Sequence, residues 1–361
     1  MAPPTLYVAI TNHGFGHATR TASVVAEIQN QCPEIQIIWA TTSPQWLLDS
    51  YLHAPVTYRQ RSFDIGVIQS DSVTMDKAAT LEKLQYIRAN QDSTIADEAD
   101  FLRHQNVGLV LADIPPLAAP IAHAAGIPCW MMSNFGWDLI YRDWGGEFVA
   151  IADWIQDCFR QCDRLFRLPF HEPMSAFPTV EDVGLTGGTP RFSTEELRHL
   201  WHISAPPEQT VLLTFGGLGL AQIPYEELSR LPDWQFITFA QNAPDLPNLL
   251  KITDRRYRPV DVMPLCSRIV SKPGYGTFSE ACQLRVPMIA IEREGFAEAA
   301  FLMEGLRRHA YHRILKPEEL FNGTWEFLTQ PLCPPQDDSL TLAKDGNGAI
   351  ARAVVNYLMS L

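Results

Sequence analysis

Residues 268–280 read Arg268-Ile-Val-Ser-Lys-Pro-Gly-Tyr-Gly-Thr-Phe-Ser-Glu280, and this stretch decides the fold. Its first residues are dominated by the β-branched pair Ile269-Val270, which predicts a short buried strand. A glycine-rich turn follows, and a helix is expected to open after Gly276. A strand that leads through such a turn into a helix is typical of a parallel sheet covered by helices.

The same alternation of strands and helices continues in both directions along the chain. In the N-terminal half we expect strands at 6–11, 35–40, 107–112 and 129–132, and helices at 18–30, 44–50, 81–104 and 117–125. In the C-terminal half we expect strands at 210–215, 235–240, 268–271 and 288–291, and helices at 297–309 and 348–359. Prolines and glycines loosen the pattern between residues 167 and 198, which predicts an interdomain connection.

The bulk composition narrows the class of protein. The 361 residues exceed the size of most single hydrophobic cores, so we expect two α/β domains, each a doubly wound, Rossmann-like sheet. A net charge of −13 with 28 scattered Lys and Arg argues against nucleic acid as a partner. Seven irregularly spaced cysteines fit a reducing cytoplasm. We expect no signal peptide and no transmembrane segment, because no basic leader or long apolar run is present.

The turn from Lys272 to Thr277 is suited to a phosphate group. It lies between a strand and a helix, where free N–H groups and the positive end of the helix dipole point out of the sheet. Lys272 adds a positive charge and Thr277 a hydroxyl donor, while Glu280, one turn into the helix, could bind ribose hydroxyls. The same residues also fit a plain tight turn in which Glu280 completes a helix cap.

The turn after the first strand, residues 12–20, places two histidines where a general base would act. Open α/β sheets bind ligands beyond the carboxyl ends of their strands, and both His13 and His17 lie there. Asp113 ends another strand and is expected at the same edge, where it could orient His17. The alternatives are exposed loop histidines and an Asp that caps the following turn, so the His17–Asp113 pair is a geometric prediction.

Three further segments are candidates with open alternatives. Gly216-Gly217 follows a strand of the second domain and could face a diphosphate or form a flexible turn. Glu298 follows another strand, with Glu292 and Glu294, and could contact sugar hydroxyls or be a surface charge. The aromatic residues of 134–144 could line an acceptor pocket or simply pack in the interior.

Several runs of this sequence resemble known families. They are His13-Gly-Phe-Gly-His-Ala-Thr-Arg20, Ser133-Asn-Phe-Gly-Trp-Asp-Leu-Ile-Tyr141, Phe215-Gly-Gly217 and Gly274-Tyr-Gly-Thr-Phe-Ser-Glu280. The chain resembles GT-B glycosyltransferases, and especially the glycosyltransferase-like N-terminal half of plant L-arabinokinases. This resemblance implies two Rossmann-like domains that face a central cleft. The kinase half of those plant proteins has no counterpart in residues 1–361, so kinase activity is not implied.

The resemblance also implies a role for each candidate residue. His17 would be the catalytic base and Asp113 its orienting partner. The donor-binding residues would be Gly216, Gly217, Val260, Lys272, Gly274, Tyr275, Gly276, Thr277 and Glu280. Contacts to the donor sugar or acceptor could come from His13, Gly16, Arg20, Asn134, Phe135, Trp137 and Glu298. An Asp-Gln pair that touches the sugar in plant-type enzymes is missing, so the sugar stays open.

The function that the resemblance implies is an inverting, metal-independent transfer of a sugar from a nucleotide sugar, expected to be UDP-linked, to an acceptor hydroxyl. No cofactor besides the nucleotide sugar is expected, and the acceptor could be a small molecule, a lipid or a saccharide. We expect an acceptor-side domain at 1–185, a donor-binding domain at 190–344 and a C-terminal helix, 345–361, that packs back on the first domain. The alternatives are a UDP-sugar epimerase or hydrolase and a non-catalytic, sugar-nucleotide-binding regulator.

Overall fold

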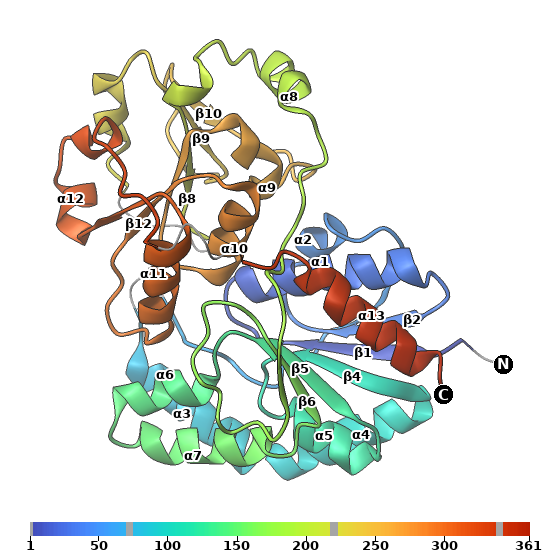
Figure 1. Ribbon diagram of the computed structural model, residues 1–361. Helices are drawn as coiled ribbons and strands as arrows, with labels where there is room; N and C mark the ends of the chain where they lie inside the picture. Colours follow the sequence, from blue (N-terminus) through green and yellow to red (C-terminus); the bar gives the residue numbers. More distant parts are fainter. Residues whose placement is uncertain (1–2, 70–74, 217–222, 337–341) are drawn as a thin grey trace.

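The computed structural model describes residues 3–69, 75–216, 223–336 and 342–361 of the chain. It contains two parallel sheets, one in each half of the sequence, with helices packed around them (Figure 1). The strand orders are β3-β2-β1-β4-β5-β6-β7 and β10-β9-β8-β11-β12-β13. In both sheets the chain starts near the middle, runs to one edge, and then continues on the other side of the first strand. The predicted pair of doubly wound α/β domains is therefore confirmed.

The first sheet is built from buried apolar strands and carries the N-terminal helices. Its strands are β1 (Thr5–Ile10), β2 (Gln36–Ala40), β3 (Thr57–Arg59), β4 (Val107–Asp113), β5 (Cys129–Ser133), β6 (Arg164–Arg167) and β7 (Val180–Asp182). The helices of this half are α1 (Gly16–Gln31), α2 (Gln45–Asp49), α3 (Lys77–Ala89), α4 (Gln91–His104), α5 (Ala118–Ala125), α6 (Trp137–Trp144) and α7 (Phe148–Phe159).

The second sheet repeats this plan with shorter strands. They are β8 (Thr210–Thr214), β9 (Gln235–Thr238), β10 (Leu249–Lys251), β11 (Arg268–Ser271), β12 (Met288–Ile291) and β13 (His312–Leu315). The α-helices of this half are α8 (Thr194–Leu200), α9 (Pro259–Val262), α10 (Tyr275–Leu284), α11 (Glu298–His309), α12 (Pro317–Phe321) and α13 (Gly346–Leu358). Short 3₁₀ helices lie at Pro207–Gln209, Tyr225–Arg230, Met263–Leu265 and Glu326–Leu328.

The single helix predicted at 81–104 is two helices in the structure, because the helix is interrupted at Asn90. Asn90 ends α3 and precedes α4, and its side-chain amide donates to the carbonyl of Tyr86. Asn competes with the helical backbone for hydrogen bonds in this way, which favours a helix end. Strands β6 and β7 were not predicted, and β7 lies within the segment interpreted as the interdomain connection.

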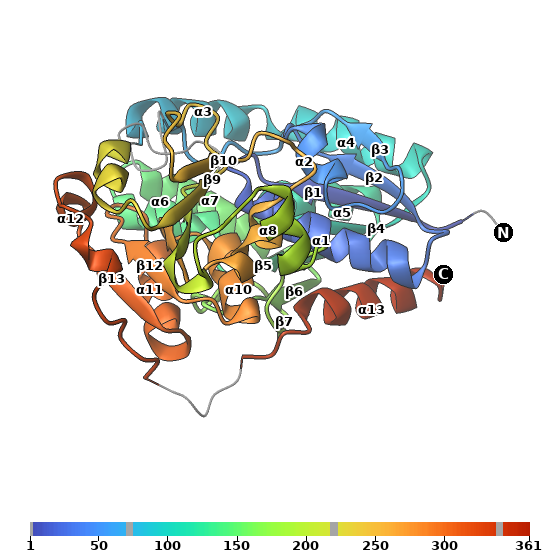
Figure 2. The same ribbon diagram turned by 90° about the horizontal axis from the view of Figure 1, so that it is seen from above.

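The last helix, α13, returns from the second half of the chain to the first sheet. It packs along α1, as both views of the ribbon show (Figures 1 and 2). Its buried side chains, Ile350, Ala351, Val354 and Leu358, lie at helical spacing on one face. The same apolar cluster continues through α1 to residues of α10, so the two halves share a continuous core there.

Among the described residues, no helix combines the length and the apolar composition needed to cross a membrane.

Candidate functional site

The candidate site lies at the carboxyl ends of three neighbouring strands, β1, β4 and β5. His17 stands in the first turn of α1, directly after β1, and Asp113 is the last residue of β4. The two side chains meet: His17 Nδ1 lies 2.9 Å from Asp113 Oδ1, and both side chains are buried. Parallel strands end at one edge of their sheet, so the topology brings together residues far apart in the chain.

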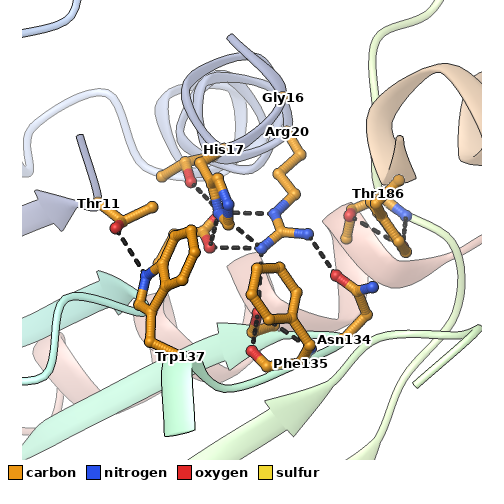
Figure 3. A network of polar contacts seen from close by, with 12 residues as sticks. Thr11, Gly16, His17, Arg20, Asn134, Phe135, Trp137 and Thr186 are labelled. Atoms are coloured by element: carbon orange, nitrogen blue, oxygen red, sulfur yellow. Dashed lines mark hydrogen bonds and ion pairs between the residues drawn. The ribbon is translucent and has the colours of Figure 1, made fainter. Parts of the chain in front are cut away.

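Arg20, one helical turn after His17, completes this cluster (Figure 3). Its guanidinium forms two bonds of 2.6 Å to Asp113, from Nε to Oδ2 and from Nη2 to Oδ1. Thr21 Oγ1 donates to Asp113 Oδ2 at 2.9 Å. Burial alone would raise the pKa of Asp113, but Arg20 and His17 lower it to about 2. The carboxylate is therefore ionised at neutral pH.

His17 Nδ1 has a second neighbour, because Arg20 Nη2 lies 2.9 Å from it. The guanidinium can only donate, whereas Asp113 can only accept. With the proton on Nδ1, the imidazole donates to Asp113 and leaves Nε2 as a free base. With the proton on Nε2, Nδ1 accepts from Arg20 instead. The position of this one proton decides whether His17 can act as a base toward a ligand.

The remaining Arg20 contacts tie the cluster to the segment after β5. Arg20 Nη1 donates to Asn134 Oδ1 at 2.8 Å and Nη2 to Ser133 Oγ at 3.1 Å. Arg20 and Asn134 are only 2% and 0% exposed. Protein groups occupy their polar atoms in this structure, and their contacts to the donor sugar or the acceptor stay a prediction.

Phe135 and Trp137 differ from the prediction that they contact ligand. Both are 1% exposed and pack around His17, with ring centroids 5.8 and 6.1 Å from the imidazole. Trp137 Nε1 donates to Thr11 Oγ1 at 2.9 Å (Figure 3). The alternative of interior packing therefore describes these two rings, because apolar contact with the His17 turn covers them.

Two contacts cross from this cluster to the second half of the chain. Asn134 Nδ2 donates to Glu298 Oε1 at 2.8 Å, and the His13 ring stacks on Phe296 at 5.8 Å. Burial, and then the charges of His17 and Lys272, lower the pKa of His13, so it is neutral at pH 7. The candidate base and the predicted sugar-contacting carboxylate are thus joined through Asn134.

The N-termini of α1 and α10 meet between the two sheets, and neither has a side-chain cap. A Cβ added to Gly276 would lie 3.7 Å from the Cα of Gly16, so the two helix starts nearly touch. Capped helices do occur in this chain, since Asp76 and Ser193 cap α3 and α8. Uncapped N–H groups and two positive dipole ends therefore converge on one place, an arrangement that attracts an anion.

Glycine at positions 274 and 276 is not required by the backbone. Gly274 has an extended φ of −165°, and Gly276 lies in the first turn of α10. A Cβ on Gly274 would meet nothing within 4 Å, and on Gly276 its nearest neighbour would be Thr19 Oγ1 at 3.6 Å. The absence of side chains leaves the N–H groups of the turn open to close approach.

Lys272 lies beside this turn, as predicted from its place after β11. A Cβ on Gly216 would lie 3.1 Å from Lys272 Cε, so Gly216 and the lysine side chain are neighbours. Burial and the nearby charge of Arg293 lower the pKa of Lys272 to about 7. Gly217, predicted to bind donor together with Gly216, lies outside the described residues.

Tyr275 and Glu280 both face the connection between the domains. The Tyr275 hydroxyl lies 3.3 Å from both the N–H and the Oγ1 of Thr186, and Arg20 lies over its ring at 5.0 Å. Tyr275 therefore braces α10, and its contact with a donor stays a prediction. Glu280 Oε1 accepts from Gly188 N at 2.9 Å, and burial raises the pKa of Glu280 to about 7.

Val260 is buried next to the same connection. A Cβ added to Gly188 would lie 3.0 Å from Val260 Cγ1 and 3.2 Å from Glu280 Oε1. The residues predicted to hold the base and the ribose of a nucleotide are therefore neighbours, and both lie close to Gly188. Thr277 stands half-exposed at the start of α10, where its hydroxyl was predicted to act.

Two residues of this region were missed in the sequence. Asp64 is buried and accepts from Asn12 N at 2.9 Å and from the Thr11 hydroxyl, which holds the turn after β1. It lies in a segment with no periodic pattern, so no signal marked it. Arg293 follows β12 between two glutamates that were considered, and its place after a strand was a usable signal. No group of three or more metal-binding side chains occurs within the described residues.

Comparisons with known proteins give one curated relative in sequence. The chain is 30% identical over 324 residues to L-arabinokinase of Arabidopsis thaliana, an alignment that covers 88% of this chain and 31% of that protein. The chain thus spans about a third of the curated relative it matches. No protein-family model matches the sequence.

Solved glycosyltransferases share the fold along nearly their whole length. The calicheamicin glycosyltransferase CalG4 has a TM-score of 0.63 at 16% identity, with 99% of each chain covered. A UDP-glucosyltransferase from Polygonum tinctorium has a TM-score of 0.63 at 15% identity, with 100% of each chain covered. UDP-glucose:anthocyanidin 3-O-glucosyltransferase, solved with UDP, has a TM-score of 0.59 at 12% identity, with 99% of this chain and 94% of that chain covered. The fold is therefore the GT-B fold of these glycosyltransferases.

Proposed function

We propose that this chain is an inverting glycosyltransferase that moves a sugar from a nucleotide sugar, UDP-linked, to an acceptor hydroxyl. His17 Nε2 takes the proton of the acceptor hydroxyl, whose oxygen then attacks the anomeric carbon of the donor. The bond from that carbon to the diphosphate oxygen breaks, and its electron pair leaves with the nucleoside diphosphate. Asp113 holds the Nδ1 proton of His17 and stabilises the imidazolium that forms.

One observation carries this proposal: the His17–Asp113 pair stands at the start of α1, directly opposite the uncapped start of α10. The base and the anion-binding turn therefore belong to two helix starts that lie next to each other. The N–H groups at Gly274–Thr277 and Lys272 would stabilise the charge that develops on the leaving diphosphate. The proposed mechanism uses no metal ion and no cofactor besides the nucleotide sugar.

The choice of UDP is supported by the related folds. One of the matched glycosyltransferases is a complex with UDP, and another is named a UDP-glucosyltransferase. In this proposal Val260 contacts the uracil and Glu280 the ribose. The acceptor we propose is a small molecule, a lipid or a saccharide. The proposal places the enzyme in the cytoplasm, where its seven free cysteines stay reduced.

The test is release of UDP from a panel of UDP-sugars in the presence of acceptor mixtures. We expect His17→Ala to lower turnover about 100-fold or more and to leave UDP affinity unchanged. His104→Ala is the matched control, because His104 is exposed at the end of α4, which leads into the start of β4 and so lies at the edge of the sheet opposite Asp113. Full turnover by His17→Ala would show that His17 is not the base.

The second candidate function is a regulator that binds a sugar nucleotide without turnover. The ion pair of Arg20 with Asp113 favours it. In a base–carboxylate pair, the carboxylate charge raises the basicity of the imidazole. Here Arg20 already forms two bonds of 2.6 Å to Asp113, which offsets much of that charge. Tight binding of a UDP-sugar by calorimetry, together with no UDP release across the acceptor panel, would support the regulator.

A further inference from the structure

Arg293, in the loop that follows β12, forms no ion pair with a carboxylate among the described residues. Its guanidinium lies over the Phe296 ring, 4.0 Å from the centroid. Its Nε and Nη2 atoms are buried and have no hydrogen-bond partner within the described part of the chain. Unpaired buried polar groups are costly, so native proteins rarely keep them without a ligand or other compensating role.

Lys272 lines the same pocket as Arg293, so two positive charges share one small space. This pocket, of about 520 Å³, lies where β11, β12 and β13 end, and Lys316 also lines it. The two charges oppose each other: burial first, and then Arg293, lower the pKa of Lys272, and burial lowers that of Arg293 to about 10. Such a pair of like charges is unfavourable until an anion enters.

The carboxylates nearby offset this pair of charges only in part. The charge of Glu298 raises the pKa of both Lys272 and Arg293, but its Oε1 already accepts from Asn134. Glu292, Glu294 and Glu318 also line the pocket, but their side chains are exposed. No ion pair joins Lys272 or Arg293 to a carboxylate among the residues that the structure describes.

We propose that Arg293 and Lys272 form a two-cation clamp on the terminal phosphate of the leaving nucleoside diphosphate, which makes Arg293 a further catalytic residue. This inference rests on the proposed function. The diphosphate of a nucleotide sugar is dianionic, so two cations match its charge. When the sugar–oxygen bond breaks, the electron pair stays on the terminal phosphate, and the Arg293 guanidinium donates hydrogen bonds to the oxygens that carry this added charge.

The test is calorimetry with uridine, UMP and UDP on the full chain. We expect Arg293→Gln to weaken UDP binding about tenfold or more and to leave uridine and UMP binding unchanged, because only UDP carries the clamped phosphate. Arg293→Lys keeps the positive charge but lacks the paired N–H donors of the guanidinium. Its UDP affinity should fall between those of the wild-type protein and Arg293→Gln. Arg285→Gln is the matched control, since Arg285 is an exposed arginine at the opposite end of α10.

The outcomes separate this clamp from its rivals. Wild-type UDP affinity in both Arg293 variants would overturn the clamp. So would an unchanged UDP affinity together with weaker binding of UDP-glucuronate, which would assign Arg293 to a sugar carboxylate instead. If the wild-type protein binds none of the uridine nucleotides, the proposed function fails, whatever Arg293 does. Thermal unfolding of each unliganded variant verifies that it is folded. If Arg293→Gln is not folded, the comparison of UDP affinities is made with Arg293→Lys.

Discussion

At the scale of single residues, Asp113 is the centre of the cluster because three side chains share its two oxygens. Arg20 and Thr21 donate to Oδ2, while Arg20 and His17 approach Oδ1. Asp113 is 0% exposed, so water cannot replace a partner that is lost. The stability of this carboxylate therefore depends on Arg20, which supplies a full positive charge and two of its hydrogen bonds.

We predict that Arg20→Met lowers the free energy of unfolding by about 3–5 kcal/mol, because it leaves a buried carboxylate without its charge partner. Arg160→Met is the control: its ion pair with Asp157 is exposed, so its loss should cost less than about 1 kcal/mol. Urea titration of both variants gives the two values.

The double variant Arg20→Met/Asp113→Asn extends this prediction. Its loss of stability should be smaller than the sum of the two single losses, because Asn has no charge to leave unpaired. Strict additivity of the two changes would show that Arg20 and Asp113 are not energetically coupled.

The meeting of His17 and Asp113 was predictable because both follow strands of one parallel sheet. The role of Arg20 was not, although it lies one helical turn from His17 and so on the same face of α1. Position along the helix predicts proximity to His17, but not whether the guanidinium turns toward the cleft or the sheet. Arg20 turns toward the sheet because Asp113 and Asn134 offer it acceptors there.

At the scale of elements, α1 and α10 present uncapped N-termini to each other. The turn before α10 was recognised in the sequence as suited to phosphate, because a strand, two glycines and a helix follow in order. What the sequence could not show is that the start of α1 lies against it, since that contact depends on how the two sheets are placed. Weak or short elements such as β7 were missed because three exposed residues carry no apolar pattern.

We predict that Gly276→Ala changes protein stability by less than about 1 kcal/mol, since Gly276 is helical and its added Cβ meets its nearest neighbour at 3.6 Å. UDP affinity should nevertheless fall at least about tenfold, because the methyl group occupies the approach to the free N–H groups. Calorimetry with UDP and thermal unfolding measure the two effects separately.

Gly348→Ala is the control for this prediction, because it makes the same change in the first turn of α13, away from the cleft. It should leave UDP affinity unaltered. Equal UDP affinity in Gly276→Ala and the wild-type protein would remove the turn from the donor site.

At the scale of the whole molecule, the chain passes between the two sheets twice, and the two passages run side by side. Leu185 N donates to Ala343 O at 2.8 Å, and Gly346 N donates to Leu185 O at 3.2 Å. The Asn347 side-chain amide bonds both the N–H and the carbonyl of Gly187. A paired connection of this kind restrains how one domain can move relative to the other.

We predict that Leu358→Ala destabilises the protein by about 2–4 kcal/mol, because Leu358 is 2% exposed in the face that α13 packs on the first sheet. Asn356→Ala, on the exposed side of the same helix, should change stability by less than about 0.5 kcal/mol. Denaturant midpoints for both variants test this, and similar midpoints would mean that α13 contributes little to the core.

The packing of α13 also fixes the order in which the molecule can be completed. The first domain is interrupted in the sequence, because its last helix is made only after the entire second domain. During synthesis, the apolar face of α1 that α13 covers stays exposed until all the residues between α1 and α13 have been translated. The first domain, although its synthesis begins first, is therefore the last to reach its finished form.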